Sequence, residues 1–140
     1  MNGQKYEKKV AGYLRRHGYH NVRITKTSGD YGVDIIARKG FHRYAVQCKY
    51  YSKPVGVGAV QQVVGGMAYY DCDRAIVVTN NRFTRQAGEL AGMNDVTLIP
   101  DISGYETVRA MILFLLFLIL LAVFMLMVDP DLLGYIGIRS

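Results

Sequence analysis

The chain has 140 residues, with 17 Lys and Arg side chains, 11 Asp and Glu side chains and two cysteines. This length allows one ordinary domain plus an appendage and excludes two domains. Cys48 and Cys72 are too few and too far apart for a disulfide framework or a zinc site, and they fit a reducing compartment.

The N-terminal part of the chain predicts a helix followed by three strands. Apolar residues recur at helical spacing over Tyr6–His17, and Gly18 ends this helix. A tight turn at Gly40 joins the second and third strands into a hairpin. The three strands are expected at Asn21–Thr27, Val33–Lys39 and Arg43–Tyr51.

The next part of the chain alternates between helices and strands. An amphipathic helix is expected after Pro54, and the apolar run Ala75–Val78 is typical of a strand covered on both faces. Thr84 is expected to cap a helix that ends near Gly92, and Val96–Ile99 is the last strand. The element order is therefore αβββαβαβ. The inward stripe of the first of these helices is predicted to be Val57, Val60, Val64, Met67 and Ala68.

A long apolar run near the C-terminus predicts a transmembrane helix. Residues Ala110–Val128 include no charged, polar, Gly or Pro residue. As a helix they extend about 28 Å, close to the roughly 30 Å hydrocarbon core of a bilayer. The alternative, a buried core helix, would need a polar stripe that this run lacks.

The charges around this run predict its orientation. Arg109 precedes it, Asp129 and Asp131 follow it, and the N-terminus has no apolar stretch of a signal peptide. The positive-inside rule then keeps the soluble domain cytoplasmic, in a single-pass protein of the cell membrane. No small-xxx-small pattern favours a helix dimer, and a homodimer remains an open alternative.

These patterns divide the chain into four segments. Residues 1–100 are expected to form an α/β domain with a mixed central sheet flanked by helices, and residues 101–108 a linker. Residues 109–128 would form the transmembrane helix and residues 129–140 a short polar tail. Residues 1–109 carry 16 Lys and Arg against nine Asp and Glu, a formal charge of +7. This charge favours a polyanionic partner, either nucleic acid or an anionic membrane.

Three polar side chains fall where the second and third predicted strands run side by side. Gln47 and Lys49 share one face of their strand, and Asp34 can approach that face across the hairpin. A carboxylate and a second side-chain oxygen form a minimal site for Mg²⁺, which accepts phosphate oxygens as further ligands. A lysine beside them can position or deprotonate a water for attack on phosphorus. The alternative is an ordinary exposed strand face, on which these residue types are common.

Longer segments around these residues resemble the Mrr-like restriction endonuclease family. The resemblance covers roughly residues 3–99, in the family's order and spacing. It implies the restriction-endonuclease-like fold, with an αβββαβ core, and metal-dependent cleavage of DNA. The matching segments are Gly32–Ala37, Val46–Tyr51, Pro54–Gly56, Val60–Gln61, Ile76–Asn80 and Phe83–Thr84, with Ala87, Leu90 and Ala91.

The resemblance implies roles for five residues. Asp34 would be a metal ligand, Gln47 would contribute an amide oxygen in a Gln-x-Lys variant of the family motif, and Lys49 would serve the attacking water or the transition-state charge. Glu7 matches an acidic position near the site, and Gln61 matches the glutamine at the start of the second helix. The alternatives are a surface glutamate for Glu7 and a helix polar residue bordering the core for Gln61.

The sequence therefore predicts a membrane-anchored, Mg²⁺-dependent endonuclease that hydrolyses phosphodiester bonds in DNA. The chain has no room for the separate DNA-reading domain that such restriction enzymes usually carry, which leaves sequence specificity open. Two other classes remain as alternatives: a catalytically inactive module that tethers DNA at the membrane, and an adaptor that binds anionic lipid. Neither gives a reason for the intact Asp34, Gln47 and Lys49.

Overall fold

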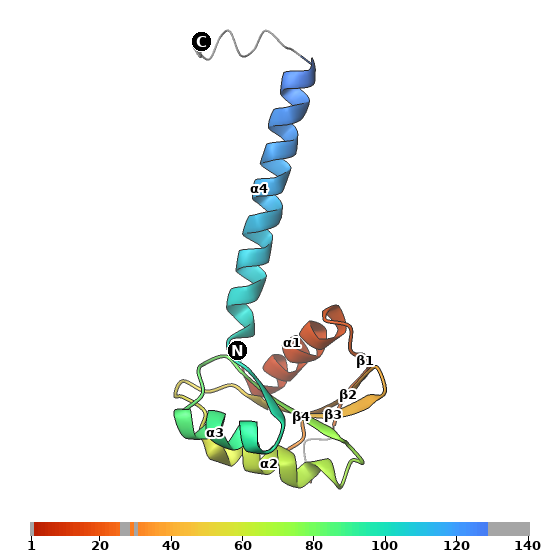
Figure 1. Cartoon of the computed structure of the whole chain (residues 1–140), viewed down its shortest axis with the longest axis vertical. Helices are drawn as coiled ribbons and strands as arrows, with labels where there is room; N and C mark the ends of the chain where they lie inside the picture. Colours follow the sequence, from red (N-terminus) through yellow and green to blue (C-terminus); the bar gives the residue numbers. More distant parts are fainter. Residues whose placement is uncertain (1, 26–28, 30, 129–140) are drawn as a thin grey trace. The chain divides into compact units, whose positions relative to one another are not determined.

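The computed structural model describes residues 2–25, 29 and 31–128, which form two compact units, Met1–Ser103 and Gly104–Ser140. The predicted order of elements is confirmed (Figure 1). The end of the first predicted strand, residues 26 and 27, and the predicted tail, residues 129–140, lie outside the described residues. The elements are α1 (Gly3–Arg16), β1 (His20–Ile24), β2 (Ile35–Lys39), β3 (His42–Lys49), α2 (Val57–Met67), β4 (Arg74–Thr79), α3 (Arg85–Met93), β5 (Val96–Ile99) and α4 (Ile102–Val128).

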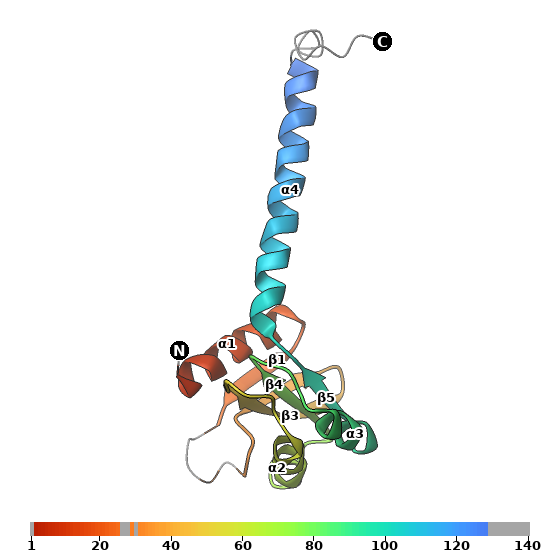
Figure 2. The ribbon, with the colours of Figure 1, turned by 90° about the vertical axis from the view of Figure 1, so that its left-hand side faces the viewer.

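The five strands form one mixed sheet in the order β1-β2-β3-β4-β5. The pairs β1–β2 and β2–β3 are antiparallel, and β3–β4 and β4–β5 are parallel. A parallel step requires a crossover connection, and α2 and α3 supply the two crossovers on one face while α1 covers the other (Figure 2). The predicted mixed sheet flanked by helices is therefore confirmed.

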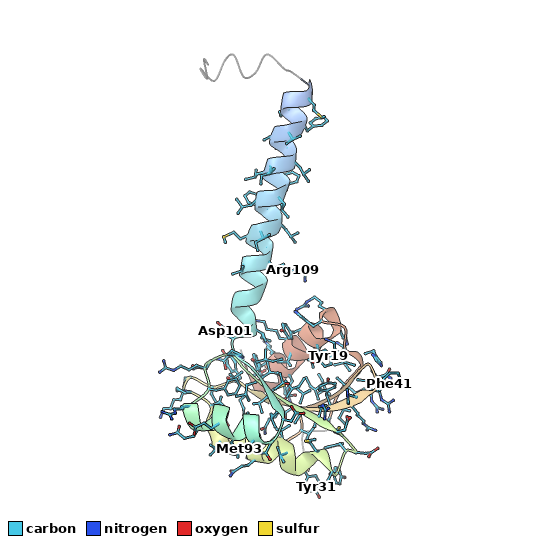
Figure 3. The ribbon with its side chains drawn as sticks, viewed as in Figure 1. Tyr19, Tyr31, Phe41, Met93, Asp101 and Arg109 are labelled. Atoms are coloured by element: carbon cyan, nitrogen blue, oxygen red, sulfur yellow. The ribbon has the colours of Figure 1, made fainter. Side chains whose placement is uncertain are left out.

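The β2–β3 hairpin forms at one end of this sheet. Its turn residue Gly40 has a φ of +59°, a conformation that glycine adopts without strain. Phe41 follows it at the tip and is fully exposed (Figure 3). Basic residues flank the tip on both strands, with Arg38 directly opposite Arg43.

The α1 face of the sheet carries a continuous apolar core. The helix begins at the cap residue Asn2, whose side chain accepts a hydrogen bond from the backbone nitrogen of Lys5 at 3.0 Å. Ile102 is buried in the same core. Its other buried members are Tyr6, Val10, Ala11, Leu14, Val22, Ile35, Ala37, Val46, Ile76 and Val78.

The opposite face is covered by α2 and α3, and here the predicted stripe on α2 was wrong in part. Val57 is exposed, and the buried residues of α2 are Ala59, Val60, Val63 and Gly66. Apolar residues occur around most of this helix, so periodicity alone did not fix which side faces the sheet. On α3 the predicted cap is confirmed, because the Thr84 hydroxyl accepts a hydrogen bond from Ala87 N at 3.2 Å.

The second unit contains most of α4, a helix of 27 residues. It begins at Ile102, within the segment expected to be a linker. Every side chain of Val108–Met125 is exposed, and all are apolar except Arg109. By length and composition α4 is long and apolar enough to cross a membrane.

Candidate functional site

Asp34 lies where β2 and β3 separate, one residue before β2 begins. Its backbone nitrogen donates to the Val46 carbonyl at 2.9 Å, which continues the antiparallel pairing by one residue. Its carboxylate accepts a hydrogen bond from the Cys48 backbone nitrogen at 2.6 Å. Asp34 is thereby fixed beside the residue that separates Gln47 from Lys49.

Gln47 and Lys49 face α2, as residues two apart on one strand should. The Gln47 side chain is buried, with its amide 2.6 Å from the Ala59 carbonyl oxygen and 3.0 Å from the Lys49 ammonium nitrogen. Both partners are satisfied when the amide nitrogen donates to Ala59 and the amide oxygen accepts from Lys49. The Gln47 oxygen is therefore the atom that faces the site.

A second amide contacts the same lysine. Gln62, on α2, accepts a hydrogen bond from the Lys49 ammonium at 2.9 Å, and its side-chain oxygen lies 2.8 Å from the Gln47 amide. The ammonium therefore lies within hydrogen-bonding distance of both the Gln47 and the Gln62 side-chain amides. This arrangement fixes the position of the positive charge while leaving the lysine partly exposed.

The family resemblance implied that Gln61, not Gln62, lies at the site. Gln61 and Gln62 are both exposed, but within the described residues no hydrogen bond joins Gln61 to Asp34, Gln47 or Lys49. Successive residues on a helix project about 100° apart, so only one of two neighbouring glutamines can face the strand. That residue is Gln62, for which neither the sequence pattern nor the resemblance predicted a role.

The backbone of the lysine strand is held from the neighbouring strand β4. The hydroxyl of the buried Thr79 donates to the Lys49 carbonyl at 2.8 Å. The next residue, Asn80, accepts from the Tyr51 nitrogen at 2.8 Å and donates to the Tyr51 carbonyl at 3.0 Å. These three bonds fix the chain on both sides of Tyr50, and nothing in the sequence pattern indicated them.

Two glycines allow the segment before Asp34 to pack closely on α2. Gly32 has a φ of +75°, and a Cβ there would lie 2.8 Å from the Gln62 Cβ and 3.2 Å from the Gln47 side-chain amide. A Cβ on Gly66 would lie 2.5 Å from Val33 Cγ2 and 2.6 Å from the Tyr31 carbonyl oxygen. Side chains at these positions would push the segment that carries Asp34 away from the site.

The electrostatics of Cys48 connect the site to α1. Burial raises the pKa of its thiol, and the negative charges of Asp34 and then Glu7 raise it further, while Lys49 opposes them. Glu7 is partly buried on α1 and lies close enough to act on this thiol. The structure therefore places Glu7 near Cys48, the residue between Gln47 and Lys49.

The donor set at this site fits a hard divalent cation with few protein ligands. Among the described residues, no three His, Cys, Asp or Glu side chains converge to hold a metal ion. Asp34 and Gln47 nevertheless offer a carboxylate and an amide oxygen, the ligand types that Mg²⁺ prefers. An open pocket of about 200 Å³ lies beside Lys49, and its lining is Lys49, Tyr51, Val55, Gly56, Gly58, Ala59 and Gln62.

Comparison with known proteins gives one family and several relatives. The family model Mrr_cat, a restriction endonuclease, matches residues 1–107. An uncharacterized protein from Archaeoglobus fulgidus is 24% identical over 109 residues, which cover 69% of this chain and 63% of that protein. This chain thus spans less than two thirds of that relative's length.

Solved structures include similar folds. A protein of unknown function aligns with a TM-score of 0.61 at 20% identity, covering 71% of this chain and 58% of that one. The DNA modification-dependent restriction endonuclease AspBHI aligns with a TM-score of 0.47 at 22% identity, covering 69% of this chain and 30% of that one. The restriction endonuclease MspJI, in complex with a 27-mer oligonucleotide, aligns with a TM-score of 0.46 at 22% identity, covering 71% and 26%.

Proposed function

Because this chain belongs to the Mrr_cat restriction endonuclease family, we propose that it is a divalent-metal-dependent DNA endonuclease anchored in a membrane by α4. The observation that carries the proposal is the hydrogen bond from the Cys48 backbone to the Asp34 carboxylate. That bond holds a carboxylate beside Gln47 and Lys49, which a structural hairpin would not require.

Asp34 and Gln47 would hold the cation, and their oxygen atoms favour Mg²⁺. When bound, the cation would supply Lewis-acid stabilisation of the charge that develops on the scissile phosphate. The neutral Gln47 contributes less negative charge than a second carboxylate would. We therefore expect weak cation binding that becomes tighter when DNA phosphate is present.

Lys49 would act on the reacting phosphate through its charge. Its ammonium lies within hydrogen-bonding distance of the Gln47 and Gln62 amides, so it need not reorganise when negative charge develops in the transition state. Glu7 would add negative charge from α1 and help retain the cation. Gln62 would position Lys49 and would not touch the substrate.

Membrane anchoring is supported by the exposed apolar surface of α4 over Val108–Met125. Arg109 at its N-terminal end favours a cytoplasmic domain. The full chain should pellet with membranes and resist carbonate extraction. Release of the full chain by carbonate would contradict the anchor and leave the nuclease proposal untouched.

Plasmid cleavage tests the nuclease itself. The full chain in detergent should nick or linearise supercoiled DNA with Mg²⁺ and fail to do so with EDTA. Asp34→Ala should abolish this activity. Gln47→Glu should retain it and Gln47→Leu should lose it, because only Glu keeps an oxygen in place. Equal activity of the two Gln47 variants would show that this side chain does not ligate the metal.

One observation favours a second candidate function. The described residues contain no cluster of three metal-binding carboxylate, imidazole or thiolate groups, and a domain that only tethers DNA at the membrane needs none. DNA binding without cleavage in both Mg²⁺ and Mn²⁺ would favour this inactive module.

A further inference from the structure

Three arginines share one face at the hairpin end of the sheet. Arg38 lies opposite Arg43 across β2 and β3, and Arg23 lies opposite Ile36 across β1 and β2. Directly opposite residues of antiparallel strands project to the same face. Ile36 belongs to the core under α2, so the arginines lie on the α2 face. Because α2 packs on β3 and β4, it leaves the β1–β2 part of this face open.

The open part of this face is a continuous groove. One cavity of about 390 Å³ is lined by Arg23, Arg38 and Arg43, and a second of about 450 Å³ is lined by Arg23, Arg43 and Tyr69. The two cavities share Arg23, Ile36 and Arg43, so we treat them as one arginine groove, defined by Arg23, Arg38 and Arg43. Its described lining contains no carboxylate.

The arginine groove keeps its positive charge. Within the described part of the chain, neither Arg23 nor Arg38 forms an ion pair, and both are exposed. The nearby Asp73 already accepts hydrogen bonds from His42 and from the Arg43 backbone nitrogen. The guanidinium groups of Arg23 and Arg38 are therefore available to an anionic ligand.

A pair of exposed tyrosines lies at the other end of the groove. The rings of Tyr31 and Tyr69 pack with centroids 4.4 Å apart, yet 60% and 64% of these residues remain exposed. Tyr69 lines the groove itself, and Tyr31 projects from the domain surface (Figure 3). Guanidinium groups bind phosphate oxygens in a bidentate manner, and exposed aromatic rings stack on unpaired bases. A lipid headgroup would use the charge but not the rings.

We propose that the arginine groove binds a DNA strand outside the cleavage site, with Arg23, Arg38 and Arg43 on phosphates and the Tyr31–Tyr69 pair against an unpaired base. This rests on the proposed function, because it takes DNA as the substrate. Arg43 and Lys49 lie six residues apart on β3, roughly 20 Å at about 3.3 Å per residue. That span equals about six nucleotides at 3.4 Å each.

The test compares two double variants of the full chain in phosphatidylcholine nanodiscs. Arg23→Gln/Arg38→Gln removes two groove charges, and Lys5→Gln/Arg85→Gln removes two exposed charges from α1 and α3. Affinity is measured without metal, by fluorescence anisotropy, for a blunt 20-bp duplex and for the same duplex with a single-stranded extension. Several salt concentrations give the slope of log affinity against log salt.

The groove variant should lower the salt slope by about two, one for each lost phosphate contact. The matched control should stay near the wild-type slope. The wild type should prefer the extended duplex, and Tyr69→Ala should reduce that preference roughly tenfold, while Tyr69→Phe keeps it.

Different failures have different meanings. Equal slopes for the groove variant and its control, in a wild type that binds and cleaves DNA, would overturn the groove and leave the proposed nuclease standing. Equal affinity of the wild type for the two duplexes would overturn base stacking. A wild type that neither binds nor cleaves DNA would overturn both the groove and the proposed function. An effect of the arginines that appears only with phosphatidylglycerol in the nanodisc would assign the groove to lipid instead.

Discussion

The two ends of β3 hold their polar side chains in opposite ways. At the Lys49 end, the Asp34 carboxylate accepts from a backbone nitrogen, Lys49 lies against two side-chain amides, and Thr79 holds the strand. At the Arg43 end, Arg23 and Arg38 are exposed and form no ion pair with a described residue. Chemistry at phosphorus needs groups fixed to within a fraction of an ångström, whereas attraction of a polyanion needs only charge. The contrast indicates separate tasks for the two ends.

The largest expected difference between the two ends of β3 is in the kinetics of DNA cleavage. Lys49→Ala should lower the cleavage rate at saturating DNA by about 10²–10³-fold, as loss of a preorganised electrostatic group does. The groove variant Arg23→Gln/Arg38→Gln should raise the DNA concentration needed for half-maximal rate and leave the saturated rate unchanged. Single-turnover plasmid cleavage over a range of enzyme concentrations separates the two. A reduced saturated rate in the groove variant would contradict the separation of catalysis at the Lys49 end from DNA binding at the Arg43 end.

The close packing at the site end can be tested on stability. Gly66→Ala should destabilise the unit Met1–Ser103 by about 2–3 kcal/mol, because its Cβ would meet Val33 and the Tyr31 carbonyl at 2.5 and 2.6 Å. Gly65 is the matched control, since nothing lies within 4 Å of a Cβ there. Gly65→Ala should stabilise α2 by up to about 1 kcal/mol. Urea unfolding followed by circular dichroism measures both, and similar effects would mean that the packing is looser than described.

A smaller effect distinguishes the two neighbouring glutamines of α2. Gln62→Leu should lower the saturated cleavage rate by about 10- to 100-fold, because a hydrogen bond to a charged group contributes roughly 1.5–3 kcal/mol. Gln61→Leu should change it by less than about twofold, since the hydrogen bond from Lys49 goes to Gln62. Unchanged DNA affinity in both variants is the control for binding. A larger loss in Gln61→Leu would restore the role first expected for that residue.

The smallest expected difference between the two ends of β3 is in the alkylation rates of Cys48, near Lys49, and Cys72, near Arg43. Burial raises the pKa of both thiols, and the charges of Asp34 and Glu7 raise the pKa of Cys48 further, whereas Arg43 lowers that of Cys72. Alkylation requires the thiolate, so its rate should rise with pH and reach its midpoint above the ordinary value of about 8.5. Iodoacetamide labelling of Cys48→Ser and Cys72→Ser at pH 8 should modify the remaining Cys72 faster than the remaining Cys48. Equal rates would contradict the electrostatic difference.

Most of the fold could be predicted because local signals agreed with the final packing. The hairpin turn at Gly40, the apolar run Ala75–Val78 and the cap at Thr84 each carry a signal within a few residues. The rotation of α2 could not be predicted, because nearly every side of that helix offers an apolar residue. Only contact with the sheet selects Ala59, Val60, Val63 and Gly66 as the inner side.

The candidate site was harder to predict for the same reason. Asp34, Gln47 and Lys49 follow from strand alternation and a short hairpin, and the structure brings them together. Gln62 depends on the rotation of α2, and Thr79 depends on the parallel pairing of β3 with β4. Neither relation is local in the sequence. The arginine groove is likewise formed from three strands, and no motif links its members.

Because Phe41 at the hairpin tip is fully exposed, cleavage of the chain after this residue can show whether the arginine groove is occupied. Exposed loop tips are where proteases cut folded domains, and chymotrypsin cuts after aromatic residues such as this one. The hydrolysable bond lies between Arg38 and Arg43, on the strands that border the arginine groove. A DNA strand seated there would shield that bond from the protease. Limited proteolysis of the unmutated chain would therefore measure occupancy of the groove. The yield of the two chymotrypsin fragments should decrease as DNA is added.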